Sequence, residues 1–474
     1  MKNLLQLALI LFTTSVFSQA GHIMQSAGSV NMSMGGAATA QPLDISGALQ
    51  WNPAAISVFD SKIINFDIGA FFSSPELSST VPTPDGGSFS GITEDDRGVS
   101  PMPALAFVYG KEGSKHTFGA SAVGISGFGV TFPENVNYPQ DLQGTPNPNF
   151  DPTQPVNPIN FPQLAGGFGH IESDYMLLQV GFAWAYEITN ELSIGVQPTI
   201  NYAALELAPN PIASPDFPED KGGEGNGYPT SDKASAIGYG AQFGVFYNSP
   251  SGFKLGASYK TAQKFSDLEF NNTYLDPDPD DAPAPDVAFN MDYPSILSLG
   301  LGYSTGDFDL AVDYRFVEYE NTDGFAEKGW KIAENGFPTG SVKGFGWKNM
   351  NIISAGLQYK GIKKLPLRVG YTYSSNPIDS ELAFFSIPAT AIIKNAFQFG
   401  TSYPITDNFM LNGVFHYGTS GGKTEGKLLD PIPDVMGGHW NADTAPLGAI
   451  PGSKVGYEMT TSMLMLGVTY TFDK

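Results

Sequence analysis

The sequence has no cysteine, few basic residues and no long apolar run beyond its start. Without cysteine, disulfide bonds, thiolate metal sites and lipid attachment at a lipobox are excluded. Lysine and arginine number 24 against 47 acidic residues, and the net charge of −23 argues against a nucleic-acid partner, which calls for clustered basic residues. After residue 20 no window approaches the roughly eighteen consecutive apolar residues of a transmembrane helix.

Histidine is also scarce. The five histidines are scattered, with no metal-ligand spacing and no recognisable pairing with a serine. We therefore predict no enzymatic activity, no catalytic residue, no cofactor and no metal site. The acidic stretches 214–227 and 275–286 lack the ligand order of an EF-hand, and we interpret them as solvated loops in preference to a dedicated cation site.

Residues 1–20 have the pattern of a secretory signal peptide. Lys2 precedes an apolar run from Leu4 to Phe17, and Ser18-Gln19-Ala20 supplies the small-x-small triplet for cleavage after Ala20. The apolar run is too short to span a bilayer and no charged stop follows it. The sequence therefore predicts export from the cytoplasm and removal of this segment.

Most of the remaining chain alternates apolar residues with small or polar ones. Near its end, one face carries an unbroken apolar set: Leu464, Leu466, Val468, Tyr470 and Phe472. A period of two is typical of β-strands, and the opposite face is too small and polar to form a sandwich core. Because only helices and closed barrels satisfy their backbone groups in lipid, any membrane embedding must be as a β-barrel.

We predict fourteen strands, at 62–74, 101–110, 115–127, 173–188, 191–206, 234–248, 252–269, 287–304, 307–319, 347–360, 365–375, 393–404, 408–419 and 457–472. Short and long connections alternate between them. This pattern is typical of outer-membrane barrels, which have short periplasmic turns and long outer loops. A soluble β-sandwich or propeller is the alternative, but no blade-length repeat supports a propeller. The predicted fold class is all-β: a 14-stranded antiparallel transmembrane barrel over residues 61–474.

The tract before the first strand, residues 21–60, is rich in glycine, alanine and serine. A barrel of fourteen strands encloses a lumen too wide for its own side chains to fill. The tract has the place and the length to fold inward as a plug, and Pro53 would stiffen its turn. A flexible tail is the alternative, but Trp51, Ile56 and Phe59 are unusual in a solvated extension.

The segment AGHIMQSAGSVNMSMGGAATA, followed by SGALQWNPAAIS, resembles the hatch of the FadL/TodX family of outer-membrane transporters for long-chain fatty acids and other hydrophobic compounds. Asn52, Pro53 and Ala54 match the NPA element of that family. Further similarity lies in 253–260, 293–319 and 365–378, so the resemblance covers nearly the whole mature chain. Alternate apolar residues ending at Phe472 also look like the C-terminal signal that the outer-membrane assembly machinery reads, although two residues follow.

The resemblance implies capture of ligand by the outer loops, a pocket within the barrel, and release through a kinked third strand beside a mobile hatch. In this sequence the third strand carries Gly124, Gly127 and Gly129, and glycine in a strand marks a bulge or kink. Ordinary small inward-facing residues are the alternative reading. The loop that follows, 130–172, carries the residues that we predict for ligand capture: Phe132, Phe150, Phe161, Leu164 and Phe168. Packing of this loop on itself is the alternative.

A fatty-acid carboxylate calls for a cation in the lumen. The alternation in 310–319 turns Asp313 and Arg315 inward, and Arg368 is turned inward in the same way. We predict Arg315 and Arg368 as carboxylate contacts, with a structural charge network as the alternative.

The predicted partners are a fatty acid or other hydrophobic small molecule, outer-membrane lipid and lipopolysaccharide, and the assembly machinery of a Gram-negative outer membrane. The alternative function is that of a FadL-like interaction component of the type IX protein secretion machinery.

Overall fold

The computed structural model describes residues 22–82, 86–207, 233–270, 287–332, 336–390 and 392–473. The predicted signal peptide and both acidic stretches, 214–227 and 275–286, lie outside these residues. No helix in the described ranges is long and apolar enough to cross a membrane.

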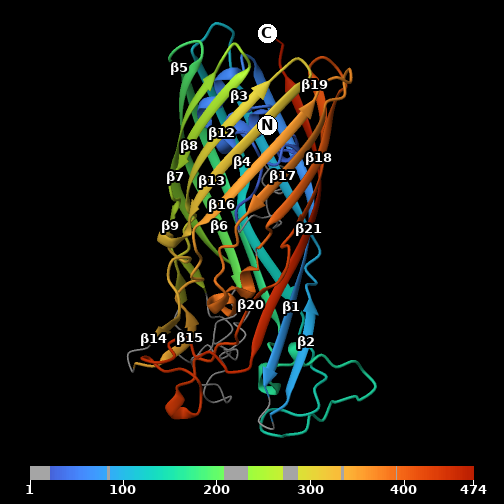
Figure 1. Cartoon of the computed structure of the whole chain (residues 1–474), viewed down its shortest axis with the longest axis vertical. Coiled ribbons are helices and arrows are strands. Elements are labelled where there is room, and N and C mark those ends of the chain that lie inside the picture. The colour runs from blue at the N-terminus through green and yellow to red at the C-terminus, as the bar shows by residue number, and fades with distance from the viewer. Residues whose placement is uncertain are drawn as a thin grey trace, which may run out of the picture.

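The chain forms a closed antiparallel β-barrel (Figure 1). Its main sheet has 17 strands, and three of them, β2 (Ser88–Glu94), β9 (Lys264–Phe265) and β20 (Thr424–Gly426), are short additions beside longer strands. The other fourteen pair in chain order, and the last of them pairs with the first from Ile63↔Thr471 to Thr80↔Lys454. These strands are β1 (Lys62–Pro82), β3 (Val99–Tyr109), β4 (His116–Phe132), β5 (Ile171–Glu187), β6 (Leu192–Leu207), β7 (Ala234–Asn248), β8 (Phe253–Lys260), β12 (Ser295–Ser304), β13 (Phe308–Glu318), β16 (Met350–Tyr359), β17 (Leu367–Ser374), β18 (Asn395–Pro404), β19 (Phe409–Thr419) and β21 (Lys454–Thr471).

Each predicted strand overlaps one of these fourteen, so the predicted barrel is confirmed. The largest difference lies between β8 and β12, where 252–269 and 287–304 were expected to be continuous. The strands separate instead into β9, which pairs with β7, and a small antiparallel pair formed by β10 (Leu268–Phe270) and β11 (Val287–Phe289). The β8–β12 ladder stops at Lys260↔Ile296, and a single bridge between Gln263 and Tyr293 follows it.

The two faces of the wall differ in polarity. On β13, Leu310 and Val312 are 45% and 46% exposed on the outside, whereas Asp313 and Arg315 are 0% and 1% exposed on the inside. Apolar side chains outside and polar side chains inside are what a barrel in lipid requires. The alternation read from the sequence therefore placed the inner and outer faces correctly.

The two rims also differ. Short turns join the strands at the rim where both ends of the barrel lie, at the top of Figure 1, and long segments join them at the other rim. The long segments contain the remaining elements: η2 (Pro158–Asn160), η3 (Gln163–Ala165), η6 (Tyr319–Asn321), β14 (Trp330–Ile332), β15 (Pro338–Val342), η7 (Ser380–Ala389) and η8 (Asp434–Met436). We call these rims the short-turn rim and the long-loop rim.

Residues 22–60, which we call the N-terminal segment, lie inside the barrel near the short-turn rim (Figure 1). The segment contains α2 (Ser29–Ser33), α3 (Ile45–Trp51) and η1 (Pro53–Val58). Helix α2 contacts β17, β18, β19 and β21, α3 contacts β1, β3 and β4, and η1 contacts β4 to β7. Asp44 begins α3 by accepting a hydrogen bond from the amide of Gly47 at 3.2 Å, and Pro53 occupies the first position of η1, where its missing N–H is not needed.

Candidate functional site

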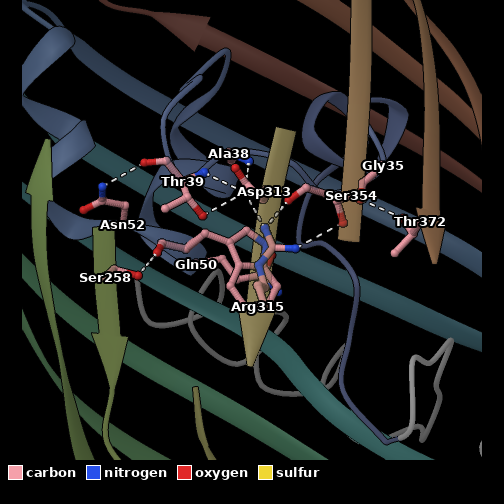
Figure 2. A network of polar contacts seen from close by, with 12 residues as sticks. Gly35, Ala38, Thr39, Gln50, Asn52, Ser258, Asp313, Arg315, Ser354 and Thr372 are labelled. Carbon is pink, nitrogen blue, oxygen red and sulfur yellow. Dashed lines mark hydrogen bonds and ion pairs between the residues drawn. The ribbon is translucent and has the colours of Figure 1, made fainter. Parts of the chain in front are cut away.

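The N-terminal segment is held to β13 by a buried carboxylate (Figure 2). Asp313 Oδ2 accepts hydrogen bonds from the amides of Ala38 and Thr39, both at 2.9 Å, and from the Thr39 hydroxyl at 2.7 Å. The same oxygen is 2.7 Å from Nη2 of Arg315. Because the carboxylate is fully buried, these four donors replace the water that it has lost.

Arg315 completes this arrangement. It donates to the carbonyl of Gly36 at 2.6 Å and to the hydroxyl of Ser354 on β16 at 3.2 Å. Its guanidinium lies over the ring of Trp51, 3.7 Å from the ring centre. These contacts are those of a structural charge network between the barrel wall and the N-terminal segment. Such a network was the alternative interpretation of Arg315. Its contact with a ligand carboxylate stays a prediction.

Arg368 lies on the inner wall at β17, apart from this network. It donates to Gln358 at 2.6 Å and to Ser402 at 2.9 Å, both on neighbouring strands. Its role as a carboxylate contact also stays a prediction.

The Asn52-Pro53-Ala54 turn is fixed against β6 and β7. The side-chain amide of Asn52 donates to the carbonyls of Thr39 at 2.8 Å and Val245 at 3.1 Å, and its oxygen accepts from the amide of Ala54 at 3.1 Å. A single side chain thus ties two parts of the segment to each other and to the wall. All three residues of the turn are buried.

The inner wall lacks side chains where the segment touches it. A Cβ atom at any of several wall glycines would collide with the backbone or side chains of the segment. These glycines are Gly195, Gly244, Gly256, Gly300, Gly356, Gly370 and Gly400. The signal is present in the sequence but is not among the predictions made from it above. Glycine at inward-facing strand positions indicates close approach by another backbone, and it could have mapped the segment onto β6, β7, β8, β12, β16, β17 and β18.

The third barrel strand, β4, is irregular where a kink was predicted. Its ladder with β5 shifts register between Gly124 and Ser126, and its ladder with β3 ends just before, at Ala104↔Val123. The start of the N-terminal segment pairs with this bulge: the amide of Met24 donates to the carbonyl of Ile125 at 3.0 Å.

The three predicted glycines of β4 have different surroundings. A Cβ atom on Gly124 would meet nothing within 4 Å. The amide of Gly127 donates to the carbonyl of His22 at 3.1 Å. Gly129 leaves room for the guanidinium of Arg97, which forms an ion pair at 2.5 Å with Asp174 of the neighbouring strand β5. Gly124 and Gly127 therefore flank the bulge, and Gly129 lies under an ion pair.

His22 itself lies in a box of aromatic rings. Its Nδ1 is 2.7 Å from the hydroxyl of Tyr319, and its ring stacks on Phe325 with a centroid distance of 4.6 Å. Tyr293 and Trp347 lie beside it at 5.8 and 5.9 Å. Burial lowers the pKa of His22 to about 3, so the imidazole is neutral at physiological pH while the N-terminal segment lies inside the barrel.

An apolar cavity of about 290 Å³ opens at the long-loop rim. It is lined by Ser79, Val81, Phe89, Gly91, Leu142, Pro158, Ile159, Gly166, Gly167, Phe168, Phe384, Leu428, Leu429, Asp430 and Ile450. We call it the rim pocket. Four separate stretches of the chain contribute to it, and this is why the sequence did not reveal most of its lining.

Of the five residues predicted for ligand capture, Phe168 lines the rim pocket. Phe132 and Phe161 are buried, with 1% and 8% exposure, Phe150 is half-buried, and Leu164 is 50% exposed on the same loop. The structure thus brings one of the five to the pocket. Within the described ranges, no group of three or more histidine or acidic side chains is arranged to hold a metal ion.

The sequence matches the family model described as outer membrane protein transport protein (OMPP1/FadL/TodX) over residues 162–427. No curated protein matches it. Among solved structures, the Pseudomonas putida toluene transporter TodX has a TM-score of 0.62 at 16% identity, covering 95% of this chain and 99% of that one. A Pseudomonas aeruginosa FadL homologue has a TM-score of 0.64 at 12% identity, covering 96% and 100%. The Ralstonia pickettii toluene transporter TbuX has a TM-score of 0.56 at 15% identity, covering 95% and 99%. At these identities the similarity shows the fold alone.

Proposed function

The chain belongs to the outer membrane protein transport family (OMPP1/FadL/TodX), and we propose that it carries long-chain fatty acids or related hydrophobic compounds across the outer membrane of a Gram-negative bacterium. The proposal includes export through a cleaved signal peptide at residues 1–20. Because the family is one of transport proteins, we propose no catalytic role.

The rim pocket is the observation that carries this proposal. Ligand sites for apolar molecules are concave and mostly apolar, and the lining of this pocket is of that kind. In outer-membrane barrels the long loops face the outside, so the pocket would meet compounds that arrive from the medium. We assign it the capture step.

The N-terminal segment would serve as the hatch. It fills the lumen near the short-turn rim, so a ligand that enters from the long-loop rim cannot pass straight through unless the segment moves. The turn at Asn52, Pro53 and Ala54 would keep its shape during that movement.

The bulge at Gly124 would provide the exit through the wall. Three observations support this part of the proposal: the β3–β4 ladder ends there, a Cβ atom at Gly124 would meet open space, and the segment's first described residues bond to the strand. Gly127 would release its bond to His22 when the segment moves. Arg315 would act by holding the segment to β13, and no specific observation favours the alternative role in type IX secretion.

Two substitutions in one loop test the capture step. Phe168→Asp places a carboxylate in the apolar lining, whereas Leu164→Asp makes the same change at an exposed position outside the pocket. We expect uptake of a radiolabelled hydrophobic compound by cells to fall at least about fivefold for Phe168→Asp and to change little for Leu164→Asp. Heat-modifiable migration of the folded barrel on gels checks assembly. Equal uptake by both assembled variants and the unaltered protein would contradict the proposal.

A further inference from the structure

The segments that enclose the rim pocket contain no strongly basic residue. The lining comes from residues 79–91, 142–168, 384 and 428–450, and none of these stretches has a lysine or an arginine. They do contain several acidic residues: Asp85, Asp151, Asp430, Asp434 and Asp443. A ligand that binds here therefore meets no permanent positive charge from the lining segments.

Asp430 is the charged residue of the lining itself. One of its oxygens accepts a hydrogen bond from the amide of Ile432 at 2.8 Å, and the other is 2.9 Å from Nδ1 of His439. The imidazole, the one basic side chain of these stretches, is thus engaged with a carboxylate of the protein. A second carboxylate, brought into the pocket by a ligand, would lie close to Asp430, and like charges repel.

Lysines nearby on the rim are paired with acids. Lys423 lies 2.8 Å from Glu76 and 3.7 Å from Glu458, and Lys454 lies 2.7 Å from Glu425. Their charges are therefore already compensated. Lys427, just before the lining stretch, is exposed to solvent, where screening weakens its effect on a ligand in the pocket.

The cations deeper in the lumen are also engaged. Arg315 is bonded to Asp313, Arg368 to two neighbouring side chains, Lys254 to Gln41 at 2.9 Å, and Lys260 to Gln179 at 3.0 Å. None of these four residues lines the rim pocket. Among the described residues, an anionic head group would therefore find no cation in the lining and no uncommitted guanidinium below it.

We propose that the rim pocket selects uncharged hydrophobic molecules, such as hydrocarbons and their alcohols, and disfavours carboxylates. This inference rests on the proposed capture function and narrows its substrate class. Selection arises because the Asp430 carboxylate repels an anion, while the apolar side chains of the lining bind the hydrocarbon part of both kinds of molecule equally.

A matched pair of ligands tests the inference: 1-octanol and octanoate, which have the same chain and differ in charge at pH 8. Equilibrium binding is measured on the full chain in lipid nanodiscs, with empty nanodiscs to correct for partition into lipid. We expect octanol to bind at least about tenfold more tightly than octanoate. Asp430→Asn should lower the ratio of octanol affinity to octanoate affinity at least about threefold.

Two further variants control for indirect effects. Asp434→Asn removes the same charge from a residue of the same loop that does not line the pocket, and it should leave both affinities unchanged. Ile450→Lys introduces a cation into the lining and should strengthen octanoate binding even if Asp430→Asn fails to fold.

Equal affinity for octanol and octanoate in the unaltered protein would overturn the selection of uncharged ligands and leave the capture function standing. Binding of neither ligand would instead overturn the capture function of the pocket, and the inference with it.

Discussion

The guanidinium carbon of Arg315 lies 3.7 Å from the centre of the Trp51 ring. The contact joins the barrel wall to the residue that precedes the Asn52-Pro53 turn, so the charge network and the turn are parts of one attachment. Arg315→Met keeps much of the side-chain length but removes the ion pair with Asp313. Leaving one partner of a buried pair uncompensated costs about 3–5 kcal/mol. We expect the N-terminal segment to undock, which planar-bilayer recordings would detect as increased ion conductance.

The control for this change is Arg368→Met. Arg368 is an inner-wall arginine of similar burial whose hydrogen bonds go to Gln358 and Ser402, not to the N-terminal segment. Its charge lies near enough to act on Asp44 of the segment, so the conductance of Arg368→Met should rise less than that of Arg315→Met. If Arg315→Met conducts no more than Arg368→Met and weakens fatty-acid binding only, Arg315 is a carboxylate contact and not an attachment for the segment.

Pro53→Gly tests the stiffness of the turn. Glycine lacks the ring that fixes φ, and the added freedom of the released chain should weaken docking by about 1 kcal/mol. We expect transport of hydrophobic compounds to change while the fraction of heat-modifiable, folded barrel stays the same. Loss of folded barrel with no change in transport per molecule would show that the turn is needed for assembly instead.

An added methyl group at a wall glycine is expected to collide with the N-terminal segment. A Cβ atom on Gly370 would collide with the backbone of Gly35, whereas one on Gly413 would meet only Leu466, at 3.6 Å. Gly370→Ala should therefore displace the N-terminal segment, and Gly413→Ala should not. Protease cleavage within residues 22–60 provides the measurement, since a displaced segment is accessible. Equal resistance of the two variants to protease would show that the segment adapts to an added methyl group.

Asp44 makes docking of the segment depend on pH. Burial, and then the charge of Asp67, raise the pKa of Asp44 to about 7, far above its ordinary value of 3.8. While the N-terminal segment is docked in the barrel, Asp44 holds a proton that it loses when the segment is released. The free energy of docking therefore becomes less favourable by about 1.4 kcal/mol per pH unit as pH rises from about 4 to about 7. The variant Asp44→Asn keeps a favourable N-cap residue for α3 but cannot ionise. Hydrogen exchange of residues 29–58 should slow at pH 8 in this variant. An unchanged pH dependence would contradict the assignment.

His22 has the opposite pH dependence. Its pKa is lowered from 6.5 to about 3 by burial, so the released imidazole binds a proton that the docked one does not. Docking of the first residues should therefore be fully stable above pH 6.5 and weaken as pH falls below it. Protection factors for hydrogen exchange at residues 22–27, which correct for the intrinsic pH dependence of exchange, should fall between pH 7 and pH 5. In His22→Phe this acid-induced change should disappear, and its persistence would show that another group is responsible.

The fourteen strands could be predicted because their signal is local. Alternation along β13 puts Leu310 outside and Asp313 inside, and the alternation of loop lengths fixed the strand count. Boundaries near the long-loop rim were harder, since the polar, proline-rich stretches there give no periodic signal. The short strands β2, β10, β11, β14, β15 and β20 all lie in such stretches.

The candidate site was predicted only in part because its contacts join distant parts of the sequence. The aromatic content of loop 130–172 pointed to Phe168, but Leu429 and Phe384 reach the same pocket from elsewhere in the chain. In the same way, inward orientation was predictable for Arg315, whereas its contact with Gly36 was not. Alternation predicts which face of the barrel wall a side chain occupies, whereas the residue that it contacts is known only from the folded structure.

The bulge on β4 also links docking of the N-terminal segment to the solvent around the barrel. Beyond Val123 the strand has lost β3 as a partner, and Met24 and His22 bond instead to Ile125 and Gly127. In hydrocarbon, each backbone group without a partner costs several kcal/mol, whereas water would replace the bond at little cost. The bilayer would therefore oppose the opening that we propose at Gly124, and a detergent that admits water to the wall would make that opening easier.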